Sequence, residues 1–308
     1  MASAEPSYLA IVGPTASGKT EAGVAVAERL DAEIVSVDST SVYRGMDIGT
    51  AKPRAELRAR VPHHLIDVAD PSEGFAVARF QELASEAVGA IRGRGHRVLL
   101  VGGSGLYFRA VVDDLTFPPT DPRIREALER EAELVGSQAL YERLATSDPE
   151  AAGKIEPDNV RRTVRALEVI ELTGRSFSSF AQTWDRYPEG RIRAAGIDLP
   201  RAVLHRRIEG RVREQVANGL VEEVRELVDR GFAGWLTSSQ AIGYAEVARH
   251  LQGEFDLQEA IALTSKRTKA LARRQLAWFR RDPRIRWFEA EQAGAAGLVD
   301  DLTEYLRD

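Results

Sequence analysis

One eight-residue segment constrains the fold of this chain more than any other. The segment Gly13-Pro-Thr-Ala-Ser-Gly-Lys-Thr20 has the pattern G-x-x-x-x-G-K-T and stands directly between an apolar run at 8–13 and a helical stretch at 21–30. Its two glycines let the backbone fold back, so that successive N–H groups and the N-terminus of the helix converge on phosphate oxygens. Lys19 adds a positive charge, and the Thr20 hydroxyl is a candidate ligand for Mg²⁺. The segment predicts a strand, a phosphate-binding loop and a helix, in that order.

Short apolar runs alternate with helical patterns over the first 115 residues. The candidate strands are 8–13, 32–39, 63–68 and 97–103, followed much later by 193–199 and 285–291. Such alternation is typical of a parallel sheet with helices on both faces. We therefore expect an α/β core that resembles the P-loop NTPase fold and is formed by residues 1–115 and 191–308.

A long interruption separates the two parts of this core. Residues 116–190 open with TFPPTDP and then show helical periodicity at 124–134, 137–144 and 160–172, the last stretch being followed by Gly174. This pattern predicts an all-helical insertion domain. A terminal helix is expected near 293–306.

Composition excludes several classes of protein. With 44% hydrophobic residues among 308, the chain has enough apolar material for a sizeable core and is not a disordered or fibrous protein. It has no cysteine, so disulfides, thiolate metal sites and cysteine nucleophiles are excluded. The N-terminus lacks the pattern of a signal peptide, and no segment approaches the roughly 18 apolar residues of a membrane span. We expect a cytoplasmic monomer that does not contact a membrane.

The charge of the chain is unevenly distributed. The formal net charge is −5, yet nine Lys or Arg residues lie between Lys266 and Arg286 against the single acid Asp282. A second run, from Arg201 to Arg213, has five Arg residues against Glu209. Either run alone is typical of a solvated helix face, but two of them in an acidic chain favour a polyanionic partner.

Polar residues follow the strands at the edge where ligands of open parallel sheets bind. Asp38 follows the second strand, and Ser104 lies in the turn Gly102–Gly105 after the fourth. Each could simply cap a helix or a turn. For Asp38 this explanation is weaker, because an anion beside an anion-binding loop has an electrostatic cost. It is expected to bind Mg²⁺ or to accept a proton.

His63 and His64 are interpreted as structural residues and not as metal ligands, since neighbouring residues on an extended segment point to opposite faces.

Eight segments together give the chain a resemblance to bacterial tRNA dimethylallyltransferases, which are also called tRNA isopentenyltransferases. They are GPTASGKT (13–20), DSTSVYRGMDIGTAKP (38–53), HHLIDV (63–68), GGSGLYFRA (102–110), DNVRRTVRALEVIELTG (158–174), RIEGRVREQVANGLVEEV (207–224), AIGYAEV (241–247) and TKALARRQLAWFRR (268–281). The first motif is shared with many enzymes, whereas the second in order with the fourth is far narrower.

The resemblance implies a Mg²⁺-dependent transfer of the dimethylallyl group from dimethylallyl diphosphate to the exocyclic 6-amino group of the adenosine 3′ of certain tRNA anticodons, with release of diphosphate. It implies that Asp38 accepts the proton of that amine, that Lys19 and Arg211 neutralise the leaving group, and that Thr20 ligates the metal. The implied diphosphate-binding residues are Gly13, Pro14, Thr15, Ala16, Ser17, Gly18, Lys19 and Thr20. The implied tRNA-binding residues are Asp38, Ser39, Thr40, Ser41, Ser104, Arg125, Arg161, Arg162 and Arg165. The helical insertion is expected to clasp the anticodon stem-loop.

Two residues depart from the usual pattern of the family. Ser41 stands where the family often has Gln. Ser104 stands where the family usually has Thr, and the serine keeps the hydroxyl at that position.

Three other functions share some of these features. A P-loop kinase of nucleotides or small metabolites would have the same loop and acid, but the chain shows no Arg-rich lid flanked by glycines, and a small acceptor needs no insertion of this size. An adenylate isopentenyltransferase would transfer the same group to free nucleotides, whereas the insertion and the basic runs favour RNA. A non-enzymatic RNA-binding protein would leave Asp38 beside the phosphate loop unexplained.

Overall fold

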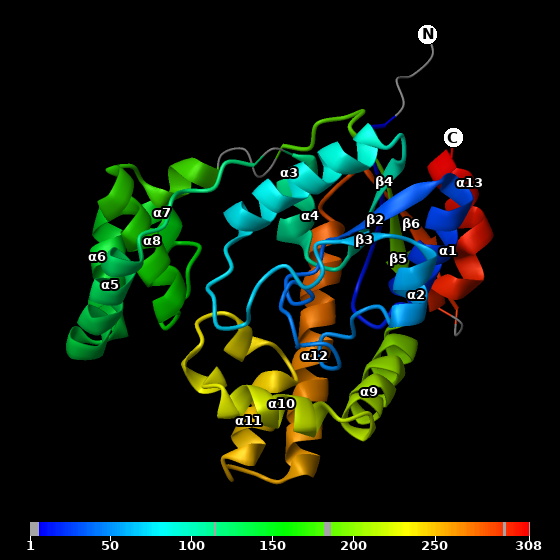
Figure 1. Ribbon diagram of the computed structural model, residues 1–308. Coiled ribbons are helices and arrows are strands. Elements are labelled where there is room, and N and C mark those ends of the chain that lie inside the picture. Colours follow the sequence, from blue (N-terminus) through cyan, green and yellow to red (C-terminus); the bar gives the residue numbers. More distant parts are fainter. Residues whose placement is uncertain (1–5, 114, 182–185, 292–293, 308) are drawn as a thin grey trace. The chain divides into compact units, whose positions relative to one another are not determined.

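The computed structural model describes residues 6–113, 115–181, 186–291 and 294–307. The chain divides into two compact units, one formed by Met1–Asp113 with Pro188–Asp308 and the other by Asp114–Tyr187. These divisions lie two or three residues from the limits of 116 and 190 that the sequence suggests. The first unit is the α/β core and the second consists of helices (Figure 1).

The core contains one six-stranded parallel sheet, in the order β3-β2-β4-β1-β5-β6. The strands are β1 Tyr8–Val12, β2 Ala32–Ser36, β3 His63–His64, β4 Arg97–Gly102, β5 Ile192–Asp198 and β6 Ile285–Glu289. All six expected strands are present, and the expected parallel α/β fold is confirmed. The strand order places β1 between β4 and β5, so the loop after β1 lies near the middle of the sheet edge.

Helices cover both faces of this sheet because successive strand residues point to opposite sides. Leu9 and Ile11 of β1 pack with α1 Lys19–Leu30 and α13 Val299–Arg307 in one buried cluster. Ala10 and Val12 pack instead with α3 Val77–Gly93 and α4 Gly105–Val112. The strands are therefore buried on both sides, which explains their continuous apolar sequences.

The third strand is shorter than its apolar sequence suggests. Leu65 (φ 63°) and Asp67 (φ 59°) adopt left-handed backbone conformations, so the extended segment ends after His64. The imidazole of His64 pairs with the carboxylate of Glu33 at 2.6 Å, and the Nδ1 atom of His63 lies 2.7 Å from the carbonyl oxygen of Val61.

Most of the remaining core helices follow β5. Four longer helices are α9 Arg201–Ala217, α10 Leu220–Asp229, α11 Tyr244–Leu251 and α12 Leu257–Phe279. Shorter elements are α2 Ala55–Arg60, η2 Phe232–Gly234, η3 Ser238–Gln240 and η4 Gly294–Leu298. Residue 293, where the sequence suggests that the terminal helix begins, lies outside the described residues.

The second unit has its own apolar core. Its helices are α5 Pro122–Val135, α6 Ser137–Ser147, α7 Pro149–Ala152, α8 Val160–Thr173 and η1 Phe177–Ala181. Leu128, Leu140, Leu144 and Leu167 form the buried centre of the unit. Helix α8 begins where the Asn159 side chain accepts a hydrogen bond from Arg162 N, and ends at Gly174, whose φ of 66° suits glycine.

No helix in the described part of the chain is long and apolar enough to cross a membrane.

Candidate active site

The loop between β1 and α1 has the backbone of a phosphate cradle. Gly13 has φ 149°, and a Cβ atom there would lie 2.9 Å from the carbonyl oxygen of Ile197, so a side chain does not fit. Gly18 is left-handed, with φ 86°, at the N-terminus of α1. The Ser17 side chain is fully buried, and its hydroxyl has no hydrogen-bond partner among the residues that the structure describes. The glycines therefore occur where the chain turns most tightly, and the loop leads into the positive end of α1.

Lys19 lies at the centre of the charges around this loop. Its ammonium donates a hydrogen bond of 2.6 Å to the carbonyl oxygen of Pro14. Burial and the neighbouring Arg211 lower its pKa from 10.5 to about 7, against the opposite effect of Asp38 and Glu21. Burial also lowers the pKa of Arg211. Two cations this close to each other favour an anionic ligand, which would relieve their repulsion.

Asp38 reaches the same place from the end of β2. The ends of β2 and β4 cross closely, because Val37 N donates to Val101 O and Ser104 N donates to Val37 O. A Cβ atom on Gly102 would lie 2.3 Å from the Val37 carbonyl oxygen, so this approach requires glycine. The Oδ1 atom of Asp38 accepts hydrogen bonds from the backbone and hydroxyl of Thr40, while Oδ2 accepts none from the described residues. Asp38 thus keeps one carboxylate oxygen available.

The serines near Asp38 join the two strand ends. Ser104 Oγ accepts a hydrogen bond of 3.1 Å from Ser39 N and lies 3.2 Å from Ser39 Oγ. Although Ser104 immediately precedes α4, it makes no side-chain cap to that helix. Ser41 is buried, and its hydroxyl contacts Ser36 Oγ at 3.0 Å and the Asp38 carbonyl oxygen at 3.3 Å. The short Ser41 side chain therefore hydrogen-bonds to the backbone of Asp38.

Many of these groups, but not Ser39 or Ser104, line one small cavity of about 90 Å³. The loop after β1 contributes Thr15, Ala16, Gly18, Lys19 and Thr20 to the lining. The other predicted site residues that line the cavity are Asp38, Ser41 and Arg211. The rest of the lining consists of Glu21, Ile34, Ser36, Thr50, Ala51, Lys52, Pro53, His63, Val101, Gly102, Gly103 and Gln275. Most small-molecule sites enclose 300–1,000 Å³. Two substrates therefore require this cavity to widen.

Two residues that we did not predict from the sequence hold the phosphate loop in place. Gln275 Oε1, from α12, accepts a hydrogen bond of 2.8 Å from Thr15 N. Arg207 Nε, from α9, donates to Ala16 O at 2.8 Å, and Arg211, one turn further along, donates to Thr15 Oγ1 at 3.0 Å. Both helices lie far from the loop in sequence. Both residues lie within the two basic runs and within family-like segments, Arg207 in 207–224 and Gln275 in 268–281, but neither pattern indicates a contact with the phosphate loop.

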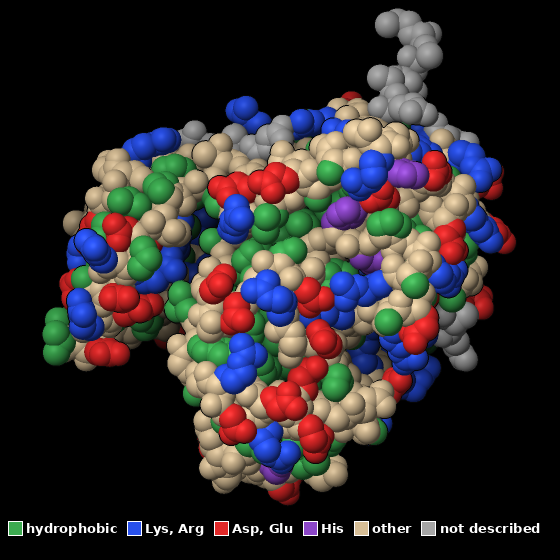
Figure 2. All heavy atoms as spheres, viewed as in Figure 1, with side chains coloured by type: hydrophobic (Ala, Val, Ile, Leu, Met, Phe, Trp, Pro, Cys, Tyr) green, Lys and Arg blue, Asp and Glu red, His purple; other side chains and the backbone are tan. Residues whose placement is uncertain are grey.

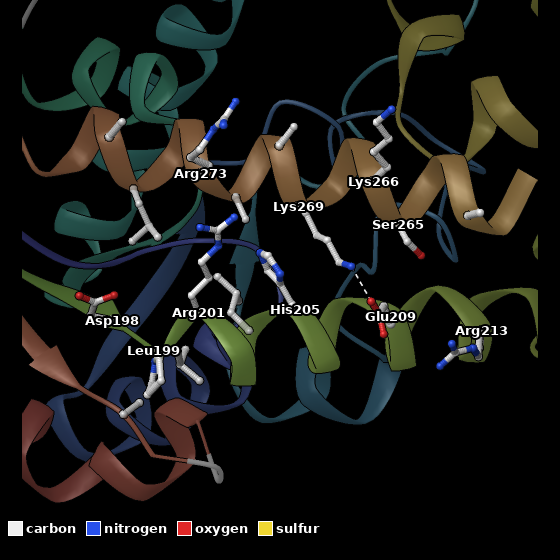
Figure 3. Close-up of a pocket in the computed structure, with 18 of the residues that line it drawn as sticks. Asp198, Leu199, Arg201, His205, Glu209, Arg213, Ser265, Lys266, Lys269 and Arg273 are labelled. Atoms are coloured by element: carbon white, nitrogen blue, oxygen red, sulfur yellow. Dashed lines mark hydrogen bonds and ion pairs between the residues drawn. The ribbon is translucent and has the colours of Figure 1, made fainter.

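A larger groove of about 1,400 Å³ lies between α9 and α12, which run alongside each other in Figure 3. It is lined by cationic residues, among them Arg201, Arg213, Lys266 and Arg273, but also by Asp198, Glu209, Glu289 and Glu291. Lys269 pairs with Glu209 across the groove. No residue of the phosphate loop lines it, so we place the candidate active site in the smaller cavity.

The basic runs serve the fold more than the sequence suggests. Several of their members are bound to partners within the core, namely Arg207, Arg211, Arg267, Lys269, Arg280 and Arg284. On the face drawn in Figure 2, Lys and Arg side chains of the core are interspersed with Asp and Glu. A polyanionic partner cannot be inferred from these runs alone.

The comparisons with known proteins decide the family. The family model described as IPP transferase matches residues 41–282. A tRNA dimethylallyltransferase of Streptomyces coelicolor is 50% identical over 303 residues, covering 98% of this chain and 94% of the relative. One of Desulforudis audaxviator is 48% identical over 290 residues, 94% of each chain. The chain belongs to the IPP transferase family.

Solved structures of the family agree with this fold. The tRNA isopentenylpyrophosphate transferase of Bacillus halodurans has a TM-score of 0.69 and 41% identity, over 98% of this chain and 97% of that one. A eukaryotic dimethylallyltransferase described as acting on tRNA shares 23% identity, with a TM-score of 0.75, and supports the fold alone. The resemblance found in the motifs is confirmed.

In this IPP transferase the four predicted RNA-binding arginines all lie in the helical unit. Arg125 and Arg165 both bind the buried carboxylate of Glu168, and Arg165 also donates to the carbonyl oxygens of Pro118 and Pro119. Burial raises the pKa of Glu168, but the hydrogen bonds from Arg125 and Arg165 outweigh this effect and hold the pKa below its ordinary value. Arg161 and Arg162 lie exposed on α8. Arg125 and Arg165 therefore have a structural role in this unit whatever else they bind.

The donor set in the cavity fits a magnesium ion. The Thr20 hydroxyl makes no hydrogen bond to the described residues, and Asp38 Oδ2 is likewise available. Mg²⁺ usually takes one or two protein oxygens and completes its shell with substrate phosphates and water. No group of three His, Cys, Asp or Glu side chains suited to a metal occurs among the described residues, so an all-protein cage is not the arrangement expected here.

Proposed function

We propose that this protein transfers the dimethylallyl group from dimethylallyl diphosphate to the exocyclic 6-amino group of the adenosine 3′ of the anticodon in certain tRNAs. The observation that carries the proposal is the convergence of the phosphate loop, Arg211 and Asp38 on one cavity. A cradle for diphosphate and a carboxylate with an available oxygen are the two parts that this chemistry requires. The names of the relatives supply the reaction and the kind of RNA.

The diphosphate would bind at Gly13–Thr20. Its oxygens compete with the Pro14 carbonyl oxygen for the Lys19 ammonium, and the Arg211 guanidinium reaches the loop through Thr15. As the C–O bond breaks, the electron pair leaves with the diphosphate. Preformed cations then stabilise the charge that develops on its oxygens. Mg²⁺ held by Thr20 and the diphosphate would supply further positive charge there.

The acceptor amine is a weak nucleophile, because its lone pair is delocalised into the adenine ring. The base must leave the stack of the anticodon loop to reach the allylic carbon. As the new N–C bond forms, the amine carries a surplus proton, which Asp38 Oδ2 would accept. Thr40 and Ser41 hydrogen-bond to Asp38 and hold it in place. With Asp38, the proposed tRNA contacts of the core are Ser39, Thr40, Ser41 and Ser104. Those of the helical unit with the anticodon stem-loop are Arg125, Arg161, Arg162 and Arg165.

The direct test is incubation of the protein with dimethylallyl diphosphate, Mg²⁺ and unmodified tRNA, followed by mass analysis of the nucleosides. We expect one five-carbon unit on the adenosine beside the anticodon. Prenylation of free adenine nucleotides but not of tRNA would favour an adenylate isopentenyltransferase. Consumption of ATP without RNA would favour a kinase, an alternative that neither the relatives nor the fold favours. We propose that the protein acts in the cytoplasm as a monomer.

A further inference from the structure

One wall of the candidate site has no regular secondary structure of its own. Residues 47–53 lie in the long connection between β2 and α2, and Thr50, Ala51, Lys52 and Pro53 line the cavity beside the phosphate loop. Ala51 has a left-handed backbone, with φ 53°. Two turn hydrogen bonds lie within the segment, from Ala51 N to Ile48 O and from Lys52 N to Asp47 O. Its other peptide groups need partners outside the segment.

A carboxylate on α10 satisfies three successive N–H groups of this wall. Glu223 accepts hydrogen bonds from Asp47 N at 3.0 Å and from Ile48 N at 3.1 Å, while Gly49 N lies 3.5 Å from its Oε1 atom. Successive N–H groups that converge in this way form an anion-binding nest. Here the anion belongs to the protein itself, and it lies outside the cavity.

Other groups hold the same three residues against the core. The fully buried Tyr244 donates from its hydroxyl to Glu223 and accepts a hydrogen bond of 3.1 Å from Gly49 N. Burial and the charge of Glu223 raise the pKa of Tyr244, so its hydroxyl stays protonated as a donor. Gln215 Nε2, on α9, donates to the carbonyl oxygens of Ile48 and Gly49 at 2.8 and 3.0 Å.

The wall packs closely against the Tyr244 ring at Gly49. A Cβ atom there would lie 2.3 Å from the Tyr244 ring. Beyond Gly49, Thr50 Oγ1 donates to Met46 O at 2.6 Å, and Lys52 Nζ donates to Asp67 Oδ1 at 2.6 Å. Lys52, the only cation that this wall brings to the cavity, also donates to Tyr43 O and to Asp47 Oδ1, each at 2.5 Å. Since the backbone N–H of Asp47 binds Glu223, this last contact links the position of Lys52 to Glu223.

We propose that Glu223 is a positioning residue for the diphosphate site. It acts through the backbone of residues 47–49, which it fixes so that residues 50–53 form the wall facing the phosphate loop. Helix α9 carries both Gln215, which binds this wall, and Arg211, which binds Thr15, so one helix sets the distance between the two sides of the cavity. The identity of the prenyl substrate rests on the proposed function, whereas the positioning of the wall does not.

The first test measures the wall without any reaction. In the unliganded protein, Glu223→Ala should increase amide hydrogen exchange at residues 47 and 48 by about 100-fold or more, because Asp47 N and Ile48 N lose their acceptor. The increase at Gly49 should be smaller, because Gly49 N keeps Tyr244 as an acceptor. Glu223→Gln keeps one acceptor oxygen and should give an intermediate rate. The matched control is Glu222→Ala, which removes the neighbouring exposed acid on the same helix, 3.9 Å from Arg225. We expect no change in the control.

The second test connects the wall to binding. With inorganic diphosphate as the probe, Glu223→Ala should raise the dissociation constant by about tenfold, with a smaller rise for Glu223→Gln and none for Glu222→Ala. In the transfer reaction, the KM for dimethylallyl diphosphate should rise in the same order, while kcat with saturating substrates stays within about threefold of the unmodified protein.

Clear results would overturn the proposal. If exchange at 47–49 is unchanged in Glu223→Gln, or if it accelerates while diphosphate affinity stays at the original value, Glu223 does not position the site. A lower melting temperature with unaltered diphosphate affinity would show a merely structural role. If Glu223→Ala does not fold, Glu223→Gln and Tyr244→Phe carry the same measurements. Absence of transfer by the unmodified protein would refute the proposed function but leave the exchange and diphosphate-binding results intact.

Discussion

Binding of diphosphate should draw a proton onto Lys19 at alkaline pH. In the unliganded cavity, burial and Arg211 hold the pKa of Lys19 at about 7. An anion in contact with the ammonium should return the pKa to at least its ordinary value near 10.4. At pH 8 about 0.9 of the unliganded Lys19 is neutral, so binding should take up about 0.9 proton at this residue. At pH 6 the uptake should be about 0.1 proton, because Lys19 is already charged.

The control variant is Lys19→Arg, whose guanidinium stays charged across this range. Calorimetric titration with inorganic diphosphate, in two buffers of different ionisation enthalpy, gives the proton uptake of each protein. Subtracting the control removes the titration of diphosphate itself. The affinity of the unmodified protein, relative to the control, should also fall about tenfold for each pH unit above 7. Equal uptake by both proteins at pH 8 would refute this account of the phosphate loop.

Two further predictions concern arginines outside the cavity. Arg284→Ala should lower the free energy of unfolding of the core by about 3–5 kcal/mol, as measured by denaturant titration. The reason is that the substitution leaves the buried carboxylates of Asp113 and Asp282 without their shared guanidinium. A loss below about 1 kcal/mol would contradict this prediction. Arg161→Ala should weaken tRNA binding and reduce the slope of log affinity against log salt by about 0.9, whereas an unchanged slope would show that Arg161 contacts no phosphate.

The parts of the site that the sequence predicts are those within single motifs. The glycines of 13–18 and Gly102 occur where only glycine fits, so the motif and the geometry coincide. Asp38 could be found because strand ends share one edge of a parallel sheet. Gln275 could not be found, because its role depends on where α12 passes the phosphate loop and not on its own neighbours in sequence.

Charge patterns were the weaker guide, because they do not reveal ion pairing. The resemblance implies that Arg125 and Arg165 contact tRNA, and the structure shows that both also bind the buried Glu168. Glu223 looks like an ordinary acid in the first turn of a helix, where negative charge is favourable. Only the fold shows that its carboxylate binds the backbone of residues 47–49.

The most direct test of the whole account is the rate of prenyl transfer by Asp38→Asn in a single turnover, with dimethylallyl diphosphate and tRNA both prebound. The substitution keeps the size of the side chain and an acceptor oxygen for Thr40, but removes the capacity to take a proton. We predict that both substrates bind within a few fold of the unmodified protein and that transfer slows by about 10²–10⁴-fold. Transfer at the original rate would show that Asp38 does not receive the proton of the amine.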